Sequence, residues 1–389
     1  MKILMVAYGE SQHSQRPLKW LLEKGHEVLF VDSFNPLPNG AKGYSFYKIN
    51  NYPYFLSLVN IFNYELTYKF REKIIYYDLT KKISEFNPDI IHIHYLDDRA
   101  RYINEIGFKP YVISIWGTDV NGCFLKPKLT RECLMRGLAL RDADKIIIDD
   151  NSIIDKCNIL AGEKIPTEYL HLGVDIKCFQ RDHTEEINAW RTKLNIEKNT
   201  IVLFSPRIWK KLYSHMEILE AFSCAINKFS DRKFVIIFKR AFANTLKAKN
   251  YEKKFTRLAH KLGVWEHVRL LDQVNFKDIP TLYKLSDLVI NFPKYDAFPV
   301  TLAEAALCNV PVVTCLLPAY QNTFAEKYFR TVETGNIKAL QEAIVAEIKN
   351  FGSVEQRNRI LKATQEAKDY FDENIYKNRI TNLYKDLIP

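Results

Sequence analysis

The sequence lacks the features that mark membrane-spanning, secreted and nucleic-acid-binding proteins. No apolar stretch reaches the roughly 18 residues that a membrane-spanning helix needs. The apolar run at residues 3–7 is too short for a signal peptide, and we expect a first buried strand there. Basic residues are scattered, and no zinc-finger, RNP or basic-arm signature is present. Nucleic acid is therefore not expected as a partner.

Paired cysteine spacings are also missing. The 7 cysteines are an odd number and include no Cys-x-x-Cys pair, whereas zinc sites and disulfide frameworks use close or paired spacings. We therefore expect free thiols in a reducing cytoplasm and no bound metal.

Acidic residues are too few to balance the basic ones, which leaves a formal net charge of +10. Such a charge favours anionic partners, either a phosphorylated substrate or an anionic membrane surface. The composition is otherwise that of an ordinary globular protein, with 47% hydrophobic and 26% charged residues.

Short runs rich in Ile, Val and aromatic residues alternate with longer amphipathic stretches, a pattern typical of parallel sheets in α/β folds. A first helix is expected at 17–24, stopped by Gly25. The expected strands are 2–7, 27–31, 89–93, 111–115, 145–149 and 168–172, then 201–205, 233–238, 267–271, 287–291 and 310–314.

The polar segment 182–200 separates the two series of strands. We predict an N-terminal domain at 1–182 and a C-terminal domain at 183–365. Both are expected to be Rossmann-like and to face each other across a cleft, because ligands bind at the carboxyl ends of parallel strands. A last helix within 366–389 is expected to pack back on the first domain.

Residues 291–305 predict a strand, a loop carrying an acid, and a helix that begins near Pro299. The backbone amides of Val300, Thr301 and Leu302 would then form an anion site, helped by the helix dipole. Glu304, about one turn further along, suits hydrogen bonds from ribose hydroxyls, and Asp296 suits the hydroxyls of a sugar. The alternative is a strand–loop–helix without a ligand, in which one acid caps the helix and the other is a solvated side chain.

This stretch resembles the motif of two acids separated by seven residues in retaining GT-B glycosyltransferases of family four. The pair here is Asp296 and Glu304, and the Pro-Val-Val strand that begins at Pro311 also matches. The family usually has glycine where this chain has Ala297, whose Cβ narrows the approach of the backbone to a sugar. The resemblance implies a nucleoside-diphosphate sugar as donor substrate, with no cofactor and no metal.

A second match follows the opening strand of the second half. Family members carry an arginine and then a lysine that hold the donor diphosphate, and this chain offers Arg207 and Lys210, with Lys211 as the fallback. The resemblance thus implies Arg207, Lys210 and Asp296 as catalytic residues. The expected donor-binding residues are Glu304, Phe298, Val300, Thr301, Lys211 and Lys239, the last together with the loop 271–273 for the base.

The resemblance implies that the domain at 183–365 binds the donor and that the domain at 1–182 is the acceptor side, where the resemblance is looser. The turn at 116–119 resembles a family turn that often holds histidine where this chain has Trp116. His94 lies on the preceding strand and on the same face as His92, nearer the carboxyl end. Residues 8–16 contain one glycine, so no G-x-G-x-x-G motif can be written. The acceptor-side candidates are His94, Asp119, Trp116 and Ser11, although each also fits a structural role.

Aromatic and basic residues interleave at helical spacing in residues 54–73. Such a helix either buries its apolar stripe in the core or lies in a lipid interface. The second arrangement would place the protein on the inner face of a membrane, beside a lipid-linked acceptor.

These features predict a glycosyltransferase that retains the anomeric configuration and is either free in the cytoplasm or peripheral on the inner face of the membrane. It would transfer a sugar from a nucleoside-diphosphate sugar to a glycan or glycolipid acceptor, in surface polysaccharide or glycoconjugate biosynthesis. Two alternatives stay open: a catalytically degenerate nucleotide-sugar-binding protein, and a sugar-nucleotide epimerase of the same fold.

Overall fold

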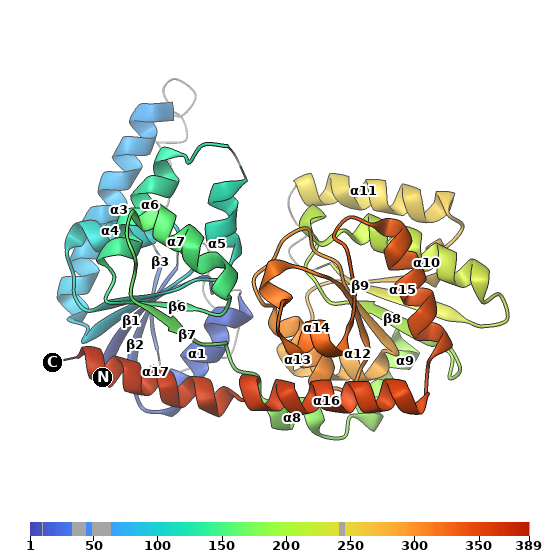
Figure 1. Cartoon of the computed structure of the whole chain (residues 1–389). Coiled ribbons are helices and arrows are strands. Elements are labelled where there is room, and N and C mark those ends of the chain that lie inside the picture. The colour runs from blue at the N-terminus through green and yellow to red at the C-terminus, as the bar shows by residue number, and fades with distance from the viewer. Residues whose placement is uncertain (10, 33–43, 49–63, 126, 241–245, 389) are drawn as a thin grey trace. The chain divides into compact units, whose positions relative to one another are not determined.

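The computed structural model describes residues 1–9, 11–32, 44–48, 64–125, 127–240 and 246–388. The chain forms two compact units, one of Met1–Leu172 with Tyr376–Pro389 and one of Gly173–Ile375 (Figure 1). The first unit therefore ends earlier than the predicted boundary at 182. The physical reason is that Phe179 is buried against Tyr283, and His183 Nδ1 lies 2.9 Å from Thr281 Oγ1, so this segment packs on the second unit.

The first unit is built on a parallel sheet with the strand order β3-β2-β1-β4-β5-β6-β7. Its strands are β1 (Lys2–Val6), β2 (Glu27–Asp32), β3 (Ser45–Lys48), β4 (Ile90–His94), β5 (Tyr111–Ser114), β6 (Lys145–Ile148) and β7 (Thr167–Tyr169). Its helices are α1 (Gln12–Glu23), α3 (Tyr64–Phe86), α4 (Asp98–Ile106), α5 (Thr118–Asn121), α6 (Arg131–Asp142), α7 (Ile154–Ala161) and most of α17 (Glu373–Leu387), with short 3₁₀ helices at Gly122–Phe124 and Asn151–Ile153.

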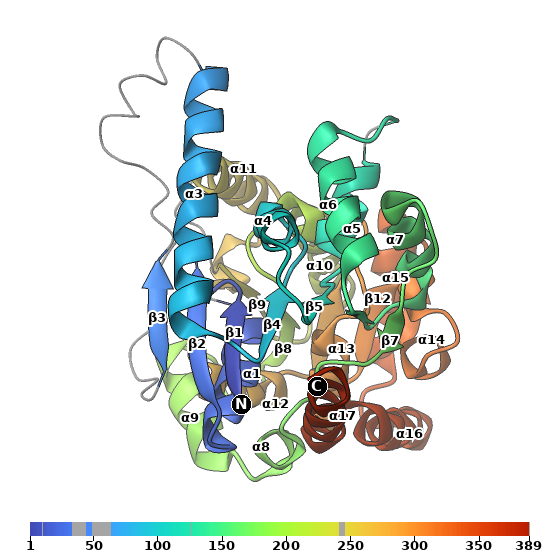
Figure 2. The ribbon, with the colours of Figure 1, turned by 90° about the vertical axis from the view of Figure 1, so that its left-hand side faces the viewer.

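Alternate residues of the strands enter two different cores, as the period of two in a strand requires. On β1, Leu4 and Val6 face α3, α4, α6 and α7, whereas Ile3 and Met5 face α1 and α17. Both faces are thus covered, which explains why β1 is apolar without interruption from Ile3 to Val6. Figure 2 shows β3, β2, β1, β4 and β5 side by side beneath α3 and α4.

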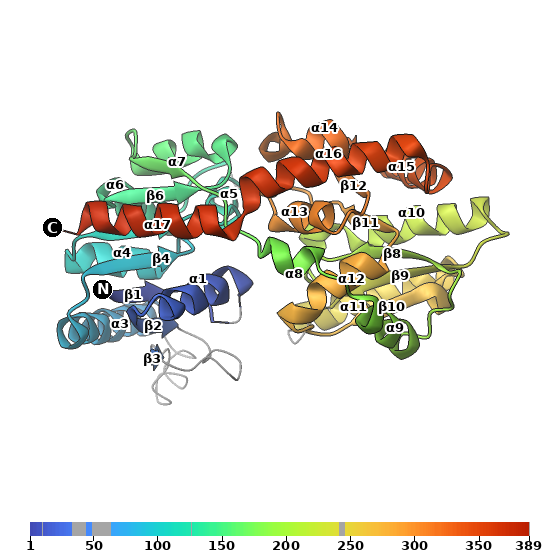
Figure 3. The same ribbon diagram turned by 90° about the horizontal axis from the view of Figure 1, so that it is seen from below.

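The end of the chain packs on the first sheet, as expected, although as a separate helix. A bend at Asp372 divides the predicted helix into α16 (Val354–Phe371) and α17. Tyr376, Ile380 and Tyr384 of α17 are buried in the core that also holds Trp20 of α1. Figure 3 shows α17 lying beside α1 along the strands.

The second unit holds a parallel sheet with the order β10-β9-β8-β11-β12-β13. Its strands are β8 (Ile201–Ser205), β9 (Phe234–Lys239), β10 (Val268–Leu271), β11 (Leu288–Asn291), β12 (Val312–Cys315) and β13 (Arg330–Val332). Besides α16, its helices are α8 (Ile176–Gln180), α9 (Thr184–Lys193), α10 (His215–Lys228), α11 (Leu246–Lys261), α12 (Ile279–Leu285), α13 (Val300–Leu307), α14 (Phe324–Tyr328) and α15 (Ile337–Lys349), with 3₁₀ helices at Lys211–Tyr213, Trp265–His267, Phe276–Asp278 and Pro318–Tyr320.

Each strand predicted from the sequence is present within one or two residues, except that β7 ends at Tyr169, three residues before the predicted end at 172. The edge strands β3 and β13 were missed, because each is short and carries little of the apolar run that marks a central strand. Helix α1 begins at Gln12 rather than at Pro17, because the Ser11 side chain accepts a hydrogen bond from the His13 amide and caps the helix.

Candidate active site

Residues that follow two strands of the second unit meet the first turn of a helix in one charged cluster. Arg207 follows β8, Asp296 follows β11, and Arg207 Nη2 lies 2.8 Å from Asp296 Oδ2. Arg207 Nη1 also donates to Thr301 Oγ1 at 3.3 Å, in the first turn of α13. The Tyr213 ring lies 4.2 Å from the guanidinium carbon and covers one face of it. The sequence predicted Arg207, Asp296 and Thr301 as site residues, and the structure brings them together.

Arg207 stays positively charged in this environment. Burial disfavours the charged guanidinium, but the carboxylate of Asp296 outweighs that effect and raises the pKa of Arg207 above its ordinary value. A permanently charged, planar donor set is what bidentate binding of a phosphate requires.

Glu304 and Lys239 extend the cluster. Glu304 is buried in α13, and its Oε2 accepts a hydrogen bond of 3.0 Å from the hydroxyl of Tyr283. Lys239 ends β9, and burial lowers its pKa, an effect that the Glu304 carboxylate opposes and the Arg207 charge reinforces. Lys239 therefore interacts electrostatically with both Glu304 and Arg207. In the loop predicted to contact the base, by contrast, Asp272 is exposed and forms an ion pair with Arg240.

The helix after the acidic loop begins where the sequence predicted it. Pro299 is the N-cap residue of α13, and its carbonyl oxygen accepts a hydrogen bond of 3.0 Å from the Leu302 amide. Leu302 is therefore a poor anion donor, which corrects the expectation of three available amides. The amides of Val300 and Thr301 in the first turn fit that role.

The side chain of Phe298 packs in the protein core and is not placed to contact the donor substrate. It is 3% exposed, and its ring stacks on Phe371 at 5.5 Å and meets Tyr320 and Phe324 edge to face. Ala297 is also buried. These contacts hold the loop between the two acids in place, while only backbone atoms of Phe298 are suited to contact a ligand.

The two candidate lysines lie in the same loop as Arg207, but their side chains are exposed. Lys210 is fixed through its backbone, because its carbonyl oxygen accepts a 3.0 Å hydrogen bond from the amide of Tyr213. Lys211 begins the 3₁₀ helix that positions the Tyr213 ring against Arg207. Neither ammonium group is joined to the charged cluster by any contact within the described residues.

Tyr283 and Tyr213 were not anticipated from the sequence. Tyr283 lies in an apolar run on α12, and Tyr213 lies in a basic loop, so neither has a local signal that separates it from a packing residue. Their roles arise only because the fold brings their rings to Glu304 and Arg207.

In the first unit, His92 and His94 share a strand face as predicted, and their rings stack at 4.0 Å. His92 is bonded on both ring nitrogens, with Nδ1 2.5 Å from Tyr384 Oη and Nε2 2.8 Å from Ser114 Oγ. Burial lowers the pKa of His92 to about 3, so the ring is neutral at pH 7. His92 is thus a core residue. His94 is the last residue of β4 and is the histidine that remains an acceptor-side candidate.

Asp119 has a structural role. Its carboxylate accepts hydrogen bonds from the backbone amides of Leu96, Trp116 and Val120, at 2.9 to 3.2 Å. Burial raises the pKa of Asp119 to about 6. With its oxygens committed to the turns after β4 and β5, Asp119 positions Trp116 rather than contacting an acceptor. Ser11 is likewise used as the cap of α1.

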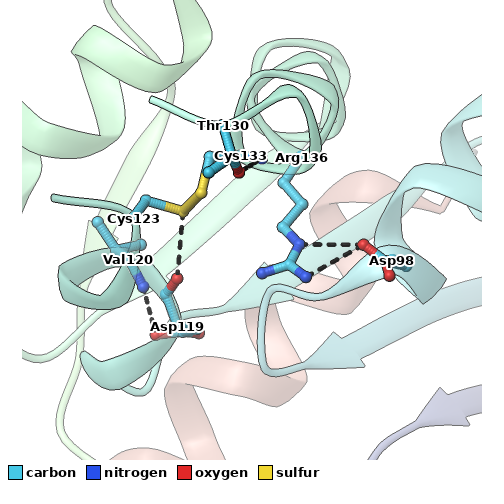
Figure 4. Close-up of a disulfide and its surroundings, with 7 residues drawn as sticks. All are labelled: Asp98, Asp119, Val120, Cys123, Thr130, Cys133 and Arg136. Carbon is cyan, nitrogen blue, oxygen red and sulfur yellow. Dashed lines mark hydrogen bonds and ion pairs between the residues drawn. A yellow bond between two sulfur atoms is a disulfide. The ribbon is translucent and has the colours of Figure 1, made fainter. Parts of the chain in front are cut away.

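Two of the seven cysteines form a disulfide, so the expectation of free thiols only was wrong. Cys123 and Cys133, ten residues apart, are joined, with their Cα atoms 5.8 Å apart (Figure 4). Cys123 follows α5 and Cys133 opens α6, so the bond depends on how two helices pack rather than on close spacing in the sequence. The other five cysteines are free.

No helix in the described part of the chain is long and apolar enough to cross a membrane. The first half of the candidate membrane-surface segment 54–73, residues 54–63, lies outside the described residues, and its second half begins α3. Further along α3, Ile75, Leu79 and Ile83 recur at intervals of four and are buried in the core of the first unit.

The chain thus has two Rossmann-like units, each built on a parallel sheet, and the second carries a cluster of arginine and carboxylates at its strand ends. This arrangement is that of the GT-B class of glycosyltransferases. Residues 186–367 match the family model of the glycosyl transferases group 1, and residues 2–150 match that of the glycosyl transferase 4-like proteins. The chain belongs to this family of glycosyltransferases.

Individual relatives are distant. The N-acetyl-alpha-D-glucosaminyl L-malate synthase of Bacillus anthracis is 23% identical over 310 residues, which cover 76% of this chain and 72% of that protein. The structure of HepE from Anabaena in complex with UDP and glucose superposes with a TM-score of 0.77 at 16% identity, over 100% of both chains. A glycosyltransferase from Rickettsia africae superposes with a TM-score of 0.73 at 17% identity, over 99% of this chain and 98% of its own.

Proposed function

We propose that the protein transfers a sugar from a nucleoside-diphosphate sugar to a glycan or lipid-linked acceptor, with retention of the anomeric configuration. The observation that carries the proposal is the cluster of Arg207, Asp296 and Glu304 at the strand ends of the second unit. It combines a cation for a diphosphate with carboxylates for hydroxyl groups.

Each group of the cluster has one part of the donor to bind. Arg207 and the first amides of α13 suit the diphosphate oxygens, with Lys210 as a second cation. Glu304, oriented by Tyr283, suits the ribose hydroxyls. Asp296 suits a hydroxyl of the transferred sugar. Complexes of HepE with UDP support the donor class, because that protein has the same fold.

The proposed reaction needs no metal, because basic residues and amides hold the diphosphate charge. The bond between the anomeric carbon and the diphosphate oxygen breaks, and its electron pair leaves with the diphosphate. The acceptor oxygen bonds to the anomeric carbon on the same face, and the acceptor proton goes to a diphosphate oxygen. Arg207 would stabilise the negative charge that develops on the leaving group.

The place of action also belongs to the proposal. The net charge of +10 is compatible with recruitment to an anionic inner membrane surface, where a lipid-linked acceptor would lie. Surface polysaccharide or glycoconjugate biosynthesis is the setting that this acceptor class suggests.

One observation favours a second candidate, a protein that binds the donor without transfer. Ala297, which lies between the two acids in the sequence, is buried, and Asp296 forms an ion pair with Arg207. A Cβ at Ala297 restricts backbone approach to a sugar. Under this second candidate function, the protein would bind the nucleotide but form no product. An epimerase would form product from the donor without any acceptor.

The test is the shift in melting temperature with UDP, GDP, ADP and CMP. A ligand at 100 times its Kd stabilises by about 2.7 kcal/mol, which shifts the melting temperature by roughly 5 °C or more. We expect a shift with one nucleoside diphosphate, and a smaller one in Glu304→Gln. The exposed Glu342→Gln is the matched control and should behave as wild type. No shift with any nucleotide would overturn the proposed donor site.

A further inference from the structure

Five aromatic rings gather at the carboxyl ends of β1, β4 and β5 in the first unit. We call this group the aromatic cluster: Tyr8, His13, His94, Tyr95 and Trp116. Trp116 is central, because its ring lies 5.0 Å from His13, 5.5 Å from Tyr95, 6.4 Å from Tyr8 and 6.5 Å from His94. Apart from the buried His94, the rings are half-buried.

The rings are held in place by polar contacts behind them. The Tyr8 hydroxyl donates a 2.6 Å hydrogen bond to Asp97 Oδ2, and the Arg99 guanidinium lies 4.2 Å from the Tyr8 ring. The backbone of Trp116 is held by the carboxylate of Asp119. Such anchoring gives a binding surface its rigidity before a ligand arrives.

Tyr95 adopts a backbone conformation that stability alone does not favour. Its φ is +86°, in the region where a side chain other than glycine costs roughly 1–3 kcal/mol. The cost is not offset by full burial of the ring, which stays half-buried. Strain of this kind concentrates at ligand sites.

His94 supplies a second, independent indication of a ligand. It is 2% exposed, and its Nε2 atom has no hydrogen-bond partner within the part of the chain that the structure describes. A buried polar atom left in this state costs about 1–3 kcal/mol. Burial lowers the pKa of His94 well below its usual value, so the imidazole is neutral and suited to a hydroxyl.

The charge balance around the rings indicates what kind of ligand fits. An anion would seek an available guanidinium or ammonium. Arg99, the buried cation against the cluster, is already paired with Asp97 at 2.8 Å, lies 3.7 Å from Asp32, and donates to the Ala7 carbonyl oxygen at 2.8 Å. Aromatic faces carry partial negative charge and attract the C–H bonds on the apolar face of a sugar ring.

We propose that the aromatic cluster binds the acceptor as an uncharged pyranose ring, with Trp116 as the stacking residue and His94 Nε2 bonded to one of its hydroxyls. The inference rests on the proposed function and specifies its acceptor class. It makes Tyr8, Tyr95 and His13 specificity-determining residues, and it distinguishes this chain from enzymes whose acceptor is a small carboxylate.

The test uses saturation-transfer NMR on the full chain. The neutral probes are the methyl pyranosides of glucose, galactose, mannose and N-acetylglucosamine, and the anionic probes are L-malate and inorganic phosphate. At least one neutral probe should receive saturation from the wild type, and the signal should fall at least fivefold in Trp116→Leu. Trp190→Leu, a half-buried tryptophan of the second unit, is the matched control and should keep the signal.

Three results would overturn the inference: no neutral probe binds, the signal is the same in Trp116→Leu, or only the anionic probes bind. Trp116→Phe keeps a ring and should retain more than half of the signal, which guards against a folding defect in the leucine variant. The melting shift with nucleotide reports on the second unit. It should persist in Trp116→Leu, so loss of the donor site and failure of the acceptor assignment give different patterns.

Discussion

Arg207 and Asp296 form a direct ion pair, 2.8 Å from Nη2 to Oδ2, between side chains that are 14% and 7% exposed. In the proposed mechanism the first binds the diphosphate and the second binds the sugar. The two groups therefore hold each other before the donor arrives, and donor binding must redistribute these contacts.

Asp296→Asn should separate the two roles. Removing the carboxylate frees Arg207, so affinity for the nucleoside diphosphate should stay the same or rise up to about tenfold, while transfer should fall about a hundredfold because a transition-state contact is lost. Calorimetric titration with the diphosphate and an initial-rate assay measure the two quantities. A drop in diphosphate affinity would contradict the arrangement, provided that the melting temperature of the free variant shows it to be folded.

Lys210→Ala should lower the transfer rate by about 10²–10³, equivalent to roughly 2.7–4 kcal/mol, the effect of losing one preorganised charge contact. Lys211→Ala changes the adjacent exposed lysine and is the matched control, with less than about a threefold loss expected. Initial rates under saturating donor decide between them. The reverse ranking would transfer the role to Lys211, and two small effects would remove both lysines from the site.

The buried His92 should make the first unit sensitive to acid. Its pKa in the folded state, about 3, lies below the unfolded value of about 6.5, so the unfolded state binds the proton first. This contribution to stability is complete above pH 6.5 and is lost as the pH falls toward 3. It amounts to about 2 kcal/mol between pH 6.5 and 5.

His92→Asn removes that titration, so its stability should fall less steeply over the same interval. Hydrogen exchange of peptides that cover β4, corrected for the intrinsic effect of pH, measures the local free energy of opening. Asp119, with its pKa raised to about 6, acts in the opposite direction and is common to both proteins. Parallel pH profiles for the two proteins would show that His92 is protonated in the folded state.

Thiol counting should find the disulfide. Of 7 cysteines, the 2 that are bridged leave 5 to react in denaturant without reductant, and all 7 should react after reduction. Cys133→Ser should show 6 thiols under both conditions and lose about 2–3 kcal/mol of stability, the entropy of closing a short loop. Seven thiols in the unreduced wild type, purified without reductant, would mean that the bond does not form.

The sequence by itself determined the two series of strands and the helix start at Pro299. Both are local: a strand buried on both faces is a continuous apolar run such as residues 3–7, and proline fixes the backbone at a helix N-terminus. The pair of acids with seven residues between them was visible for the same reason, since Asp296 and Glu304 lie in one strand–loop–helix.

Only the tertiary structure decided which of these groups meet. The hydroxyl of Tyr384 bonds to His92 across 292 residues, Tyr283 reaches Glu304 from another helix, and Cys123 meets Cys133 where two helices pack. Asp119 resembled an acceptor contact but proved to hold backbone amides. Such roles depend on distances between segments that are remote in sequence, and a local pattern carries no information about those distances.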